Sequence, residues 1–216
     1  MAGVSRGRFI TFEGGEGAGK STQLRRLAER LAAPGREVAT TREPGGSPGA
    51  EAIRALLVEG EADRWSPVSE TLLMYAARRD HIERVISPAL DRGAWVLCDR
   101  FLDSTRAYQG AAGGAPAGLI SVLEAAVVEE HLPDLTLVLD LPVAAGLARA
   151  AGRGSGEARF ETKGEAFHER LRAAFLDIAV REPERCRVID ADQDVEAVGA
   201  AVWAAIVARF GADLHG

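Results

Sequence analysis

Eight consecutive residues near the N-terminus have the types and spacing of a phosphate-binding loop. The pattern G-x-x-x-x-G-K-[ST] is satisfied by Gly14, Gly15, Glu16, Gly17, Ala18, Gly19, Lys20 and Ser21, and Thr22 follows. The glycines allow the backbone to curl so that several N–H groups point inward at an anion. The ammonium of Lys20 can reach β- and γ-phosphates, and the hydroxyl of Ser21 can ligate Mg²⁺. The segment therefore predicts a site for nucleotide phosphates.

The residues on either side of this loop supply the context that the motif requires. Residues 8–13, "RFITFE", predict a strand, and residues 22–33 place three leucines on one helical stripe. The N-terminus of that helix would add its dipole to the anion site. No N-K-x-D motif for guanine and no L-S-G-G-Q transporter motif occurs in the chain. A small kinase remains, with a nucleotide-gated regulatory protein as the alternative that is not an enzyme.

Two hydrophobic strands end in an aspartate, and either carboxylate could lie beside the phosphates. Asp99 ends "WVLCD" and is followed at once by Arg100, whereas Asp140 ends "LTLVLD" and is followed by Leu-Pro. A carboxylate beside an arginine at the carboxyl edge of a parallel sheet suits phosphoryl transfer. We therefore expect Asp99 to orient the acceptor oxygen or the Mg²⁺ shell and Arg100 to hold the acceptor phosphate. Asp140 is expected to cap the next helix.

Two further segments are candidates for the acceptor side. Arg42 lies in "TREPGG" at the end of a predicted strand, where it forms either a plain surface turn or a guanidinium fork for a phosphate. The helical segment "LLMYAARRDH" brings Met74, Arg78 and His81 near one another by its i,i+3 and i,i+4 spacing. Taken alone, the second segment is equally consistent with a helix facing the core.

Strands alternate with helices along the whole chain. Strands are predicted at 8–13, 36–41, 94–99, 135–140 and 186–190, and helices at 22–33, 49–59, 67–91, 116–131, 164–182 and 194–210. This alternation predicts an α/β fold with a parallel sheet buried on both faces. With no repeat or linker in 216 residues, one domain over residues 1–216 is expected.

Composition narrows the class of protein. The net charge of −6 and the pI of about 5.4 imply no broad basic surface, so a nucleic-acid partner is not expected. The longest charge-free apolar stretch, residues 197–208, is too short for a membrane span and predicts a C-terminal helix on the core. Cys98 and Cys186 fall in predicted strands as buried free thiols. We expect a cytoplasmic protein with no membrane partner.

A glycine-rich segment, "AGRGSGEARF" at residues 151–160, mixes glycine with cations. The segment contains Arg153 and Arg159, and Arg149 lies just before it. Composition alone is typical of a solvated loop. In a phosphate-binding protein, the alternative is a mobile lid over about residues 149–160 that brings cations to the phosphates.

Taken in order, the segments of this chain resemble the thymidylate kinase family over about residues 8–200. The resemblance is carried by "FEGGEGAGKSTQ", "TREPGG", "LLMYAARRDHIERVISPAL", "CDRFLDSTRAYQG", "PDLTLVLDLP" and "ARFETKGEAFHERLRAAF". It implies a P-loop kinase fold, in which helices flank both faces of a five-stranded parallel sheet that carries a short lid. It further implies a homodimer and the reaction of ATP with dTMP to give ADP and dTDP, with Mg²⁺.

The resemblance also implies roles for individual residues. The positions that match the dTMP site are Glu16, Arg42, Met74, Arg78, Arg100, Ser104, Thr105, Tyr108 and Gln109. Of these, Glu16 matches an acidic residue at the sugar 3′-hydroxyl, Arg42 and Arg100 match the arginines on the acceptor phosphate, and Arg78 matches the arginine on thymine. Tyr108 matches the aromatic residue under the deoxyribose, where a 2′-hydroxyl would clash.

The catalytic set implied on this basis is Lys20, Asp99, Arg100 and Arg153, with Ser21 and Asp99 beside the metal. Residues 15–18 contain no cation, so a lid arginine must supply charge to the moving phosphoryl group, as in the bacterial-type arrangement. We expect Arg153 in that role and Arg149 stacked on adenine.

Two positions depart from the family pattern. Met74 replaces the usual phenylalanine that stacks on thymine, and Ala158 replaces an acidic residue before the lid arginine. Met74 keeps open a related deoxynucleoside-monophosphate kinase with another base preference. A catalytically silent ATP-binding switch protein is the third alternative, although the lysine, the aspartate and the lid arginines that catalysis needs are all present.

Overall fold

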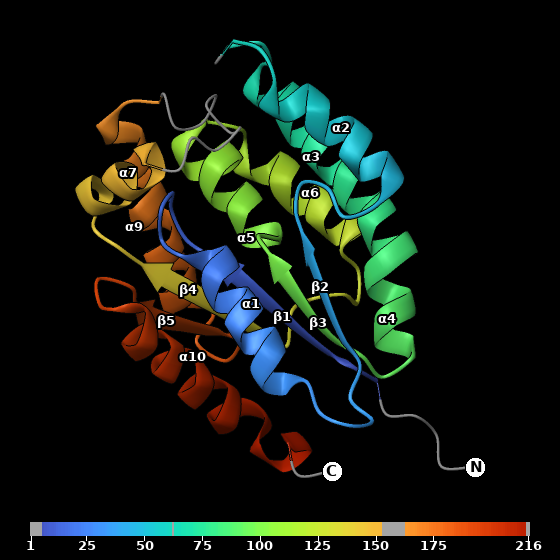
Figure 1. The fold of residues 1–216 in the computed structure, drawn as a ribbon. Coiled ribbons are helices and arrows are strands. Elements are labelled where there is room, and N and C mark those ends of the chain that lie inside the picture. The colour runs from blue at the N-terminus through green and yellow to red at the C-terminus, as the bar shows by residue number, and fades with distance from the viewer. Residues whose placement is uncertain (1–5, 62, 153–162, 215–216) are drawn as a thin grey trace.

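The computed structural model describes residues 6–61, 63–152 and 163–214 of the chain. Its centre is a parallel sheet with the strand order β2-β3-β1-β4-β5 (Figure 1). The strands are β1 (Arg8–Glu13), β2 (Val38–Arg42), β3 (Trp95–Asp99), β4 (Leu135–Asp140) and β5 (Cys186–Asp190). The predicted five-stranded parallel sheet is confirmed.

Helices cover both faces of this sheet (Figure 1). They are α1 (Lys20–Leu31), α2 (Pro48–Val58), α3 (Pro67–His81), α4 (Ser87–Asp91), α5 (Leu102–Thr105), α6 (Ala117–Val127), α7 (Val143–Ala151), α9 (Glu165–Arg181) and α10 (Val195–Phe210). A π-helical turn, Ile82–Ile86, joins α3 to α4, and a second, Arg106–Ala112, follows α5. The 3₁₀ turn Gly211–Leu214 ends the described chain.

The side chains of β1 show why the sheet needs two covering layers. Ile10 and Phe12 pack with α1 and α10 on one face, whereas Phe9 packs with α3, α4 and α6 on the other. Successive side chains of a strand point to opposite faces, so a strand with apolar residues on both faces must be covered twice. A third cluster, between β4 and α9, includes Phe167 and Phe175.

The strand order also places the ligand-binding edge. From β1 the chain crosses to β2 in one direction, and β4 lies on the opposite side of β1. Ligands of open α/β sheets bind at such a switch point, beyond the carboxyl ends of the strands. Here that point lies beyond Glu13 and Asp99, the last residues of two hydrogen-bonded neighbours.

Most of the predicted elements lie within two residues of their observed bounds. The clearest differences are the second strand, which begins at Val38, and the helix predicted at 116–131, which ends at Val127. The helix predicted at 67–91 is continuous but contains the π-helical turn. Of the lid segment, Arg149 lies in the last turn of α7, whereas Arg153, Ala158 and Arg159 lie outside the described residues.

The C-terminal helix packs on the core, as predicted. The segment Val195–Leu214 is long and apolar enough to cross a membrane, which by itself is weak evidence for a span. Its Val198, Val202, Ile206 and Phe210 are buried against α1 and the sheet. Both cysteines are buried and free, which also confirms the prediction.

Candidate active site

The phosphate loop connects β1 to α1 at the switch point. Gly14 and Gly17 have φ angles of 135° and 70°, and a Cβ on either would lie within 2.5 Å of a backbone oxygen of Leu139 or Gly146. Only glycine fits both the conformation and the space. The loop therefore presses its backbone against β4 and α7, which holds its curl.

Lys20 begins α1 and turns back over the loop. Its Nζ donates to the carbonyl oxygens of Gly14 at 3.1 Å and Gly15 at 2.9 Å. Burial, assisted by the charge of Arg100, lowers the pKa of Lys20 from its ordinary value. The ammonium is thus held where a bound phosphate would replace part of its lost hydration.

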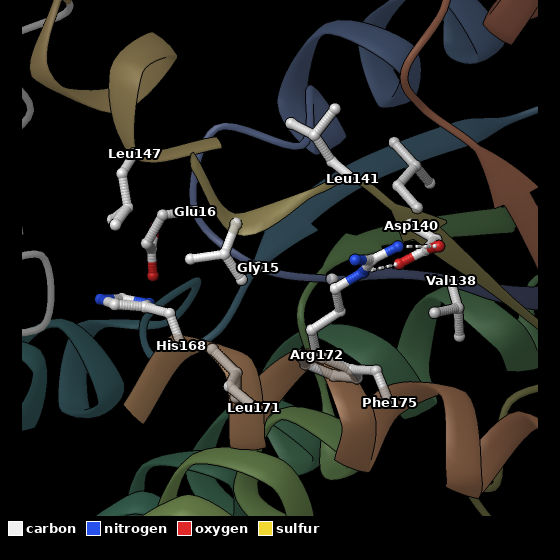
Figure 2. Close-up of a pocket in the computed structure, with 13 residues that line it drawn as sticks. Gly15, Glu16, Val138, Asp140, Leu141, Leu147, His168, Leu171, Arg172 and Phe175 are labelled. Atoms are coloured by element: carbon white, nitrogen blue, oxygen red, sulfur yellow. Dashed lines mark hydrogen bonds and ion pairs between the residues drawn. The ribbon is translucent and has the colours of Figure 1, made fainter. Parts of the chain in front are cut away.

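The two strand-end aspartates have different partners. Asp99 faces the phosphate loop, where the Ser21 hydroxyl donates to its Oδ2 at 2.5 Å. Asp140 is bound through both carboxylate oxygens by Arg172 of α9, at 2.7 and 2.9 Å (Figure 2). Asp140 does not cap the next helix as predicted, because the cap residue of α7 is Pro142. Of the two carboxylates, Asp99 is the one beside Ser21, the predicted metal ligand.

Arg100 leaves β3 with a φ of 70°, an uncommon conformation for a residue with a side chain. Its Nη1 donates to the carbonyl of Gly14 at 3.1 Å and its Nη2 to Glu16 Oε1 at 3.1 Å. The guanidinium also lies 4.8 Å from the centre of the Tyr108 ring, and the Tyr108 hydroxyl donates to Glu16 at 2.6 Å. These contacts bring together three residues of the predicted dTMP site and Gly14 of the phosphate loop.

The electrostatics of Glu16 follow from these neighbours. Burial alone would raise the pKa of Glu16, but the charges of Arg100 and Lys20 and the Tyr108 hydroxyl outweigh it and lower the pKa to about 2. The carboxylate is therefore ionised at neutral pH and available as a hydrogen-bond acceptor for a sugar hydroxyl.

Arg78, Glu43 and His81 form a buried ionic cluster. Arg78 Nε donates to Glu43 at 2.8 Å, its Nη2 donates to the Phe101 carbonyl and the Thr105 hydroxyl, and His81 meets the other oxygen of Glu43 at 3.0 Å. Nη1 of Arg78 is buried and has no hydrogen-bond partner among the residues that the structure describes. A buried donor without a partner is costly, so this atom is suited to a ligand acceptor.

Arg78 lines a pocket that gathers most of the predicted acceptor residues. The pocket is lined by Glu16, Glu43, Pro44, Val58, Met74, Arg78, Arg100, Phe101, Ser104, Thr105, Tyr108 and Gln109. Its wall at Pro44 follows a cis peptide bond after Glu43. Its mixed lining, apolar with a few converging charges, has the character of a small-molecule site.

Two predicted arginines, Arg42 for the acceptor phosphate and Arg149 for adenine, bind residues outside both the pocket and the phosphate loop. Arg42 ends β2 but turns to Glu51 of α2, with its Nη2 3.1 Å from both carboxylate oxygens. Arg149 donates to the carbonyl of Ala191 and lies 3.7 Å from Asp192, at the edge beyond β5. In this arrangement, Arg42 contacts α2 rather than the lining of the pocket.

Sequence reasoning missed several buried polar residues of the site. Glu13 binds the turn after β3 and Glu43 binds Arg78, but each stood in a quoted motif beside a residue that drew attention instead. His168 of α9 lies beside Glu16 in a cavity behind the phosphate loop (Figure 2). Its Nε2 is buried and has no partner within the described part of the chain. Nothing in the spacing of His168 marked it.

The fold and the phosphate loop together define a kinase of the P-loop class. A family model described as thymidylate kinase matches residues 12–202. The chain is 69% identical over 208 residues to a thymidylate kinase of Caulobacter vibrioides, covering 96% of this chain and 100% of the relative. It is 56% identical over 206 residues to a thymidylate kinase of Nitrobacter hamburgensis, covering 94% and 90%.

Solved structures agree with these relatives. The crystal structure of thymidylate kinase from Ehrlichia chaffeensis matches with a TM-score of 0.76 and 34% identity, over 93% of this chain and 99% of that one. The chain belongs to the thymidylate kinase family.

Proposed function

We propose that this protein is an ATP:dTMP phosphotransferase that converts dTMP to dTDP for dTTP synthesis. The observation that carries the proposal is the pairing of a phosphate loop with a separate pocket across Arg100 and Glu16. Family membership gives the same reaction. Two sites that meet at one arginine suit the in-line transfer of a phosphoryl group between two bound nucleotides.

The donor side is assigned to the phosphate loop. The backbone N–H groups of residues 14–19 would hold the ATP phosphates, and Lys20 would follow the charge of the γ-phosphoryl group as it leaves. Ser21 and Asp99 offer two hard oxygen ligands in contact with each other, which fits Mg²⁺. When bound there, Mg²⁺ would neutralise charge on the phosphates.

The acceptor side is assigned to the pocket with dTMP as its ligand. The unpartnered Nη1 of Arg78 supports a hydrogen bond to a thymine carbonyl, and Met74 supplies a polarisable face for the base. The ionised Glu16 suits the 3′-hydroxyl, with the Tyr108 ring beside it. Arg100 would hold the acceptor phosphate. Ser104, Thr105 and Gln109 complete the wall that the base faces.

Roles are also proposed for three further arginines, of which Arg153 lies outside the described residues. Arg42 would have to leave Glu51 to reach the acceptor phosphate, and a salt bridge so exposed to water is weak enough to allow this. Arg149, on the ATP side, would stack on adenine. Arg153 would supply the additional charge that residues 15–18 of the phosphate loop do not carry.

We further propose a cytoplasmic homodimer whose chains each form one P-loop domain. Large apolar side chains lie exposed on α2, α3 and α6, which pack side by side, and Val122 is 67% exposed among them. An exposed apolar surface of this kind is typical of an interface. A Val122→Asp variant that stays a dimer by light scattering would remove this face from the proposal.

The test of the proposed function is ATP consumption by purified protein with Mg²⁺ and one acceptor at a time. The acceptors are dTMP, dUMP, dCMP, dGMP, ribo-TMP and none. We expect rapid turnover with dTMP, weaker turnover with dUMP and little with the others. Preference for another monophosphate would contradict the assignment and direct attention to Met74. ATP binding without acceptor-dependent turnover would instead indicate a switch protein.

A further inference from the structure

Glu13, the last residue of β1, extends a fully buried carboxylate toward the turn that follows β3. Its Oε1 accepts hydrogen bonds from the backbone N–H groups of Phe101 at 2.8 Å and Ser104 at 3.3 Å. Its Oε2 accepts from the Ser104 hydroxyl at 2.6 Å. One side chain thus binds both ends of the short segment that enters α5.

The strained residue of the active site, Arg100, lies directly before that segment. Arg100 has a φ of 70°, and its own N–H donates to the Phe12 carbonyl at 2.9 Å. A residue with a side chain keeps such a conformation only where its surroundings fix it. The neighbours that fix it here are successive residues of β1, with Phe12 holding Arg100 and Glu13 holding the two N–H groups beyond it.

We propose that Glu13 is a positioning residue for the acceptor phosphate, because it fixes the turn that aims the Arg100 guanidinium at the pocket. The inference deepens the proposed function and rests on it. Without the Glu13 acceptors, Phe101 and Ser104 lose their anchor and Arg100 can relax out of its left-handed conformation. The guanidinium then leaves the place set by Gly14 and Glu16.

The surroundings of Glu13 agree with a role beyond filling space. Burial, with Asp103 nearby, raises the pKa of Glu13 to about 7, although Ser104, Arg100 and the Phe101 N–H oppose the shift. A carboxyl in this place is costly to ionise, and a nonpolar side chain would pack there without that cost. What the nonpolar side chain would lack is the set of acceptors for the turn.

The test compares the affinity for dTMP with that for thymidine, which lacks the phosphate. The Kd for thymidine divided by the Kd for dTMP reports how much the phosphate contributes to binding. Glu13→Met removes the acceptors at similar volume, and we expect the ratio to fall about tenfold or more while thymidine affinity changes little. Glu13→Gln keeps an acceptor for the two N–H groups and should hold the ratio within about threefold.

A matched control separates positioning from simple loss of stability. Thr11→Val, two residues earlier in β1, removes one buried hydrogen bond to Thr136 at a position that does not line the pocket. It should lower the melting temperature and leave the ratio unchanged. An unchanged ratio in Glu13→Met would overturn the proposal, whether the two affinities fall equally or neither changes.

Two further results, a Glu13→Met variant that does not fold and a wild type that does not prefer dTMP, also have a defined meaning. If Glu13→Met does not fold, Glu13→Asp takes its place, because the shorter carboxylate cannot reach both N–H groups; an unchanged ratio in that variant overturns the inference. Wild-type protein that fails to prefer dTMP over thymidine would contradict the proposed function itself. A wild-type preference that Glu13→Met retains would contradict only the role of Glu13.

Discussion

The two halves of the active site are built by different means. The phosphate loop is made of backbone, with glycines pressed on β4 and α7 and Lys20 bonded to loop carbonyls. The acceptor pocket is made of side chains from separate elements, among them Glu43 and Arg78, which are buried together with His81. A backbone site keeps its shape when one side chain changes, whereas a buried ionic cluster depends on every member.

The halves also differ in how they carry charge. The loop has a single buried cation, Lys20, whose pKa is lowered by burial. The pocket pairs its cations with carboxylates, Arg78 with Glu43 and Arg100 with Glu16. We therefore expect changes on the loop side to appear mainly in the rate, and changes on the pocket side to appear in both stability and acceptor affinity.

The largest effect is expected from the metal-side carboxylate. Asp99→Asn should keep ATP binding and lower kcat about a thousandfold, because loss of a preorganised electrostatic group costs roughly 10²–10³ in rate. The matched control is Asp140→Asn, a strand-end aspartate already bound by Arg172. Steady-state kinetics on both variants shows which of the two aspartates the reaction needs. Undiminished turnover in Asp99→Asn would transfer the role to Asp140.

The next effect tests whether the pocket is held by its ionic cluster. Arg78→Met leaves Glu43 buried without its arginine, which should destabilise the protein by about 3 kcal/mol. For a chain of this size that is a fall of roughly 6–12 °C in melting temperature. Arg79→Met breaks the neighbouring exposed pairs and should cost less than about 1 kcal/mol. Equal losses in the two variants would contradict the comparison.

A pH dependence distinguishes the carboxylate that joins the two halves. The pKa of Glu16 is lowered to about 2, so its stabilisation is present above its ordinary pKa and is lost as the pH falls from about 5 toward 2. The stability gap between wild type and Glu16→Gln should be on the order of 2 kcal/mol near pH 6 and close over that range. Urea unfolding across pH 3–7 measures the gap. A stability gap that does not change with pH would contradict the lowered pKa of Glu16.

For Glu13 the sign is opposite. Its pKa is raised to about 7, so ionisation opposes folding as the pH rises from its ordinary pKa through 7. Relative to wild type, Glu13→Gln should therefore gain stability over that interval. The same urea series measures the stability of Glu13→Gln relative to wild type. If that relative stability rose as the pH was lowered, the predicted direction would be wrong.

The smallest effect concerns the sugar. If the Tyr108 ring excludes a 2′-hydroxyl, Tyr108→Ala should raise the ribo-TMP to dTMP ratio of kcat/KM about tenfold. Tyr108→Phe keeps the ring and loses only the hydroxyl bond to Glu16, so that ratio should stay near the wild-type value. An unchanged ratio in Tyr108→Ala would remove this role from Tyr108.

The same contrast explains what the sequence could predict. The phosphate loop, the strands and the place of Asp99 at a strand end follow from local pattern, because glycine spacing and apolar runs are properties of short segments. The bond between Glu13 and the Arg100 turn, and the capture of Asp140 by Arg172, join residues far apart in the chain. No spacing rule marks such partners. The position of Arg42 was predictable but its pairing with Glu51 was not.

The most direct test of the account is the identity of the products. Wild-type protein, ATP, dTMP and Mg²⁺ are followed by ³¹P NMR until the signals stop changing. The account predicts ADP and dTDP in equal amounts, with the β-phosphate of dTDP appearing as the γ-phosphate of ATP is lost. ADP with free phosphate and unchanged dTMP would contradict it, because the phosphoryl group would then have gone to water rather than to the acceptor pocket.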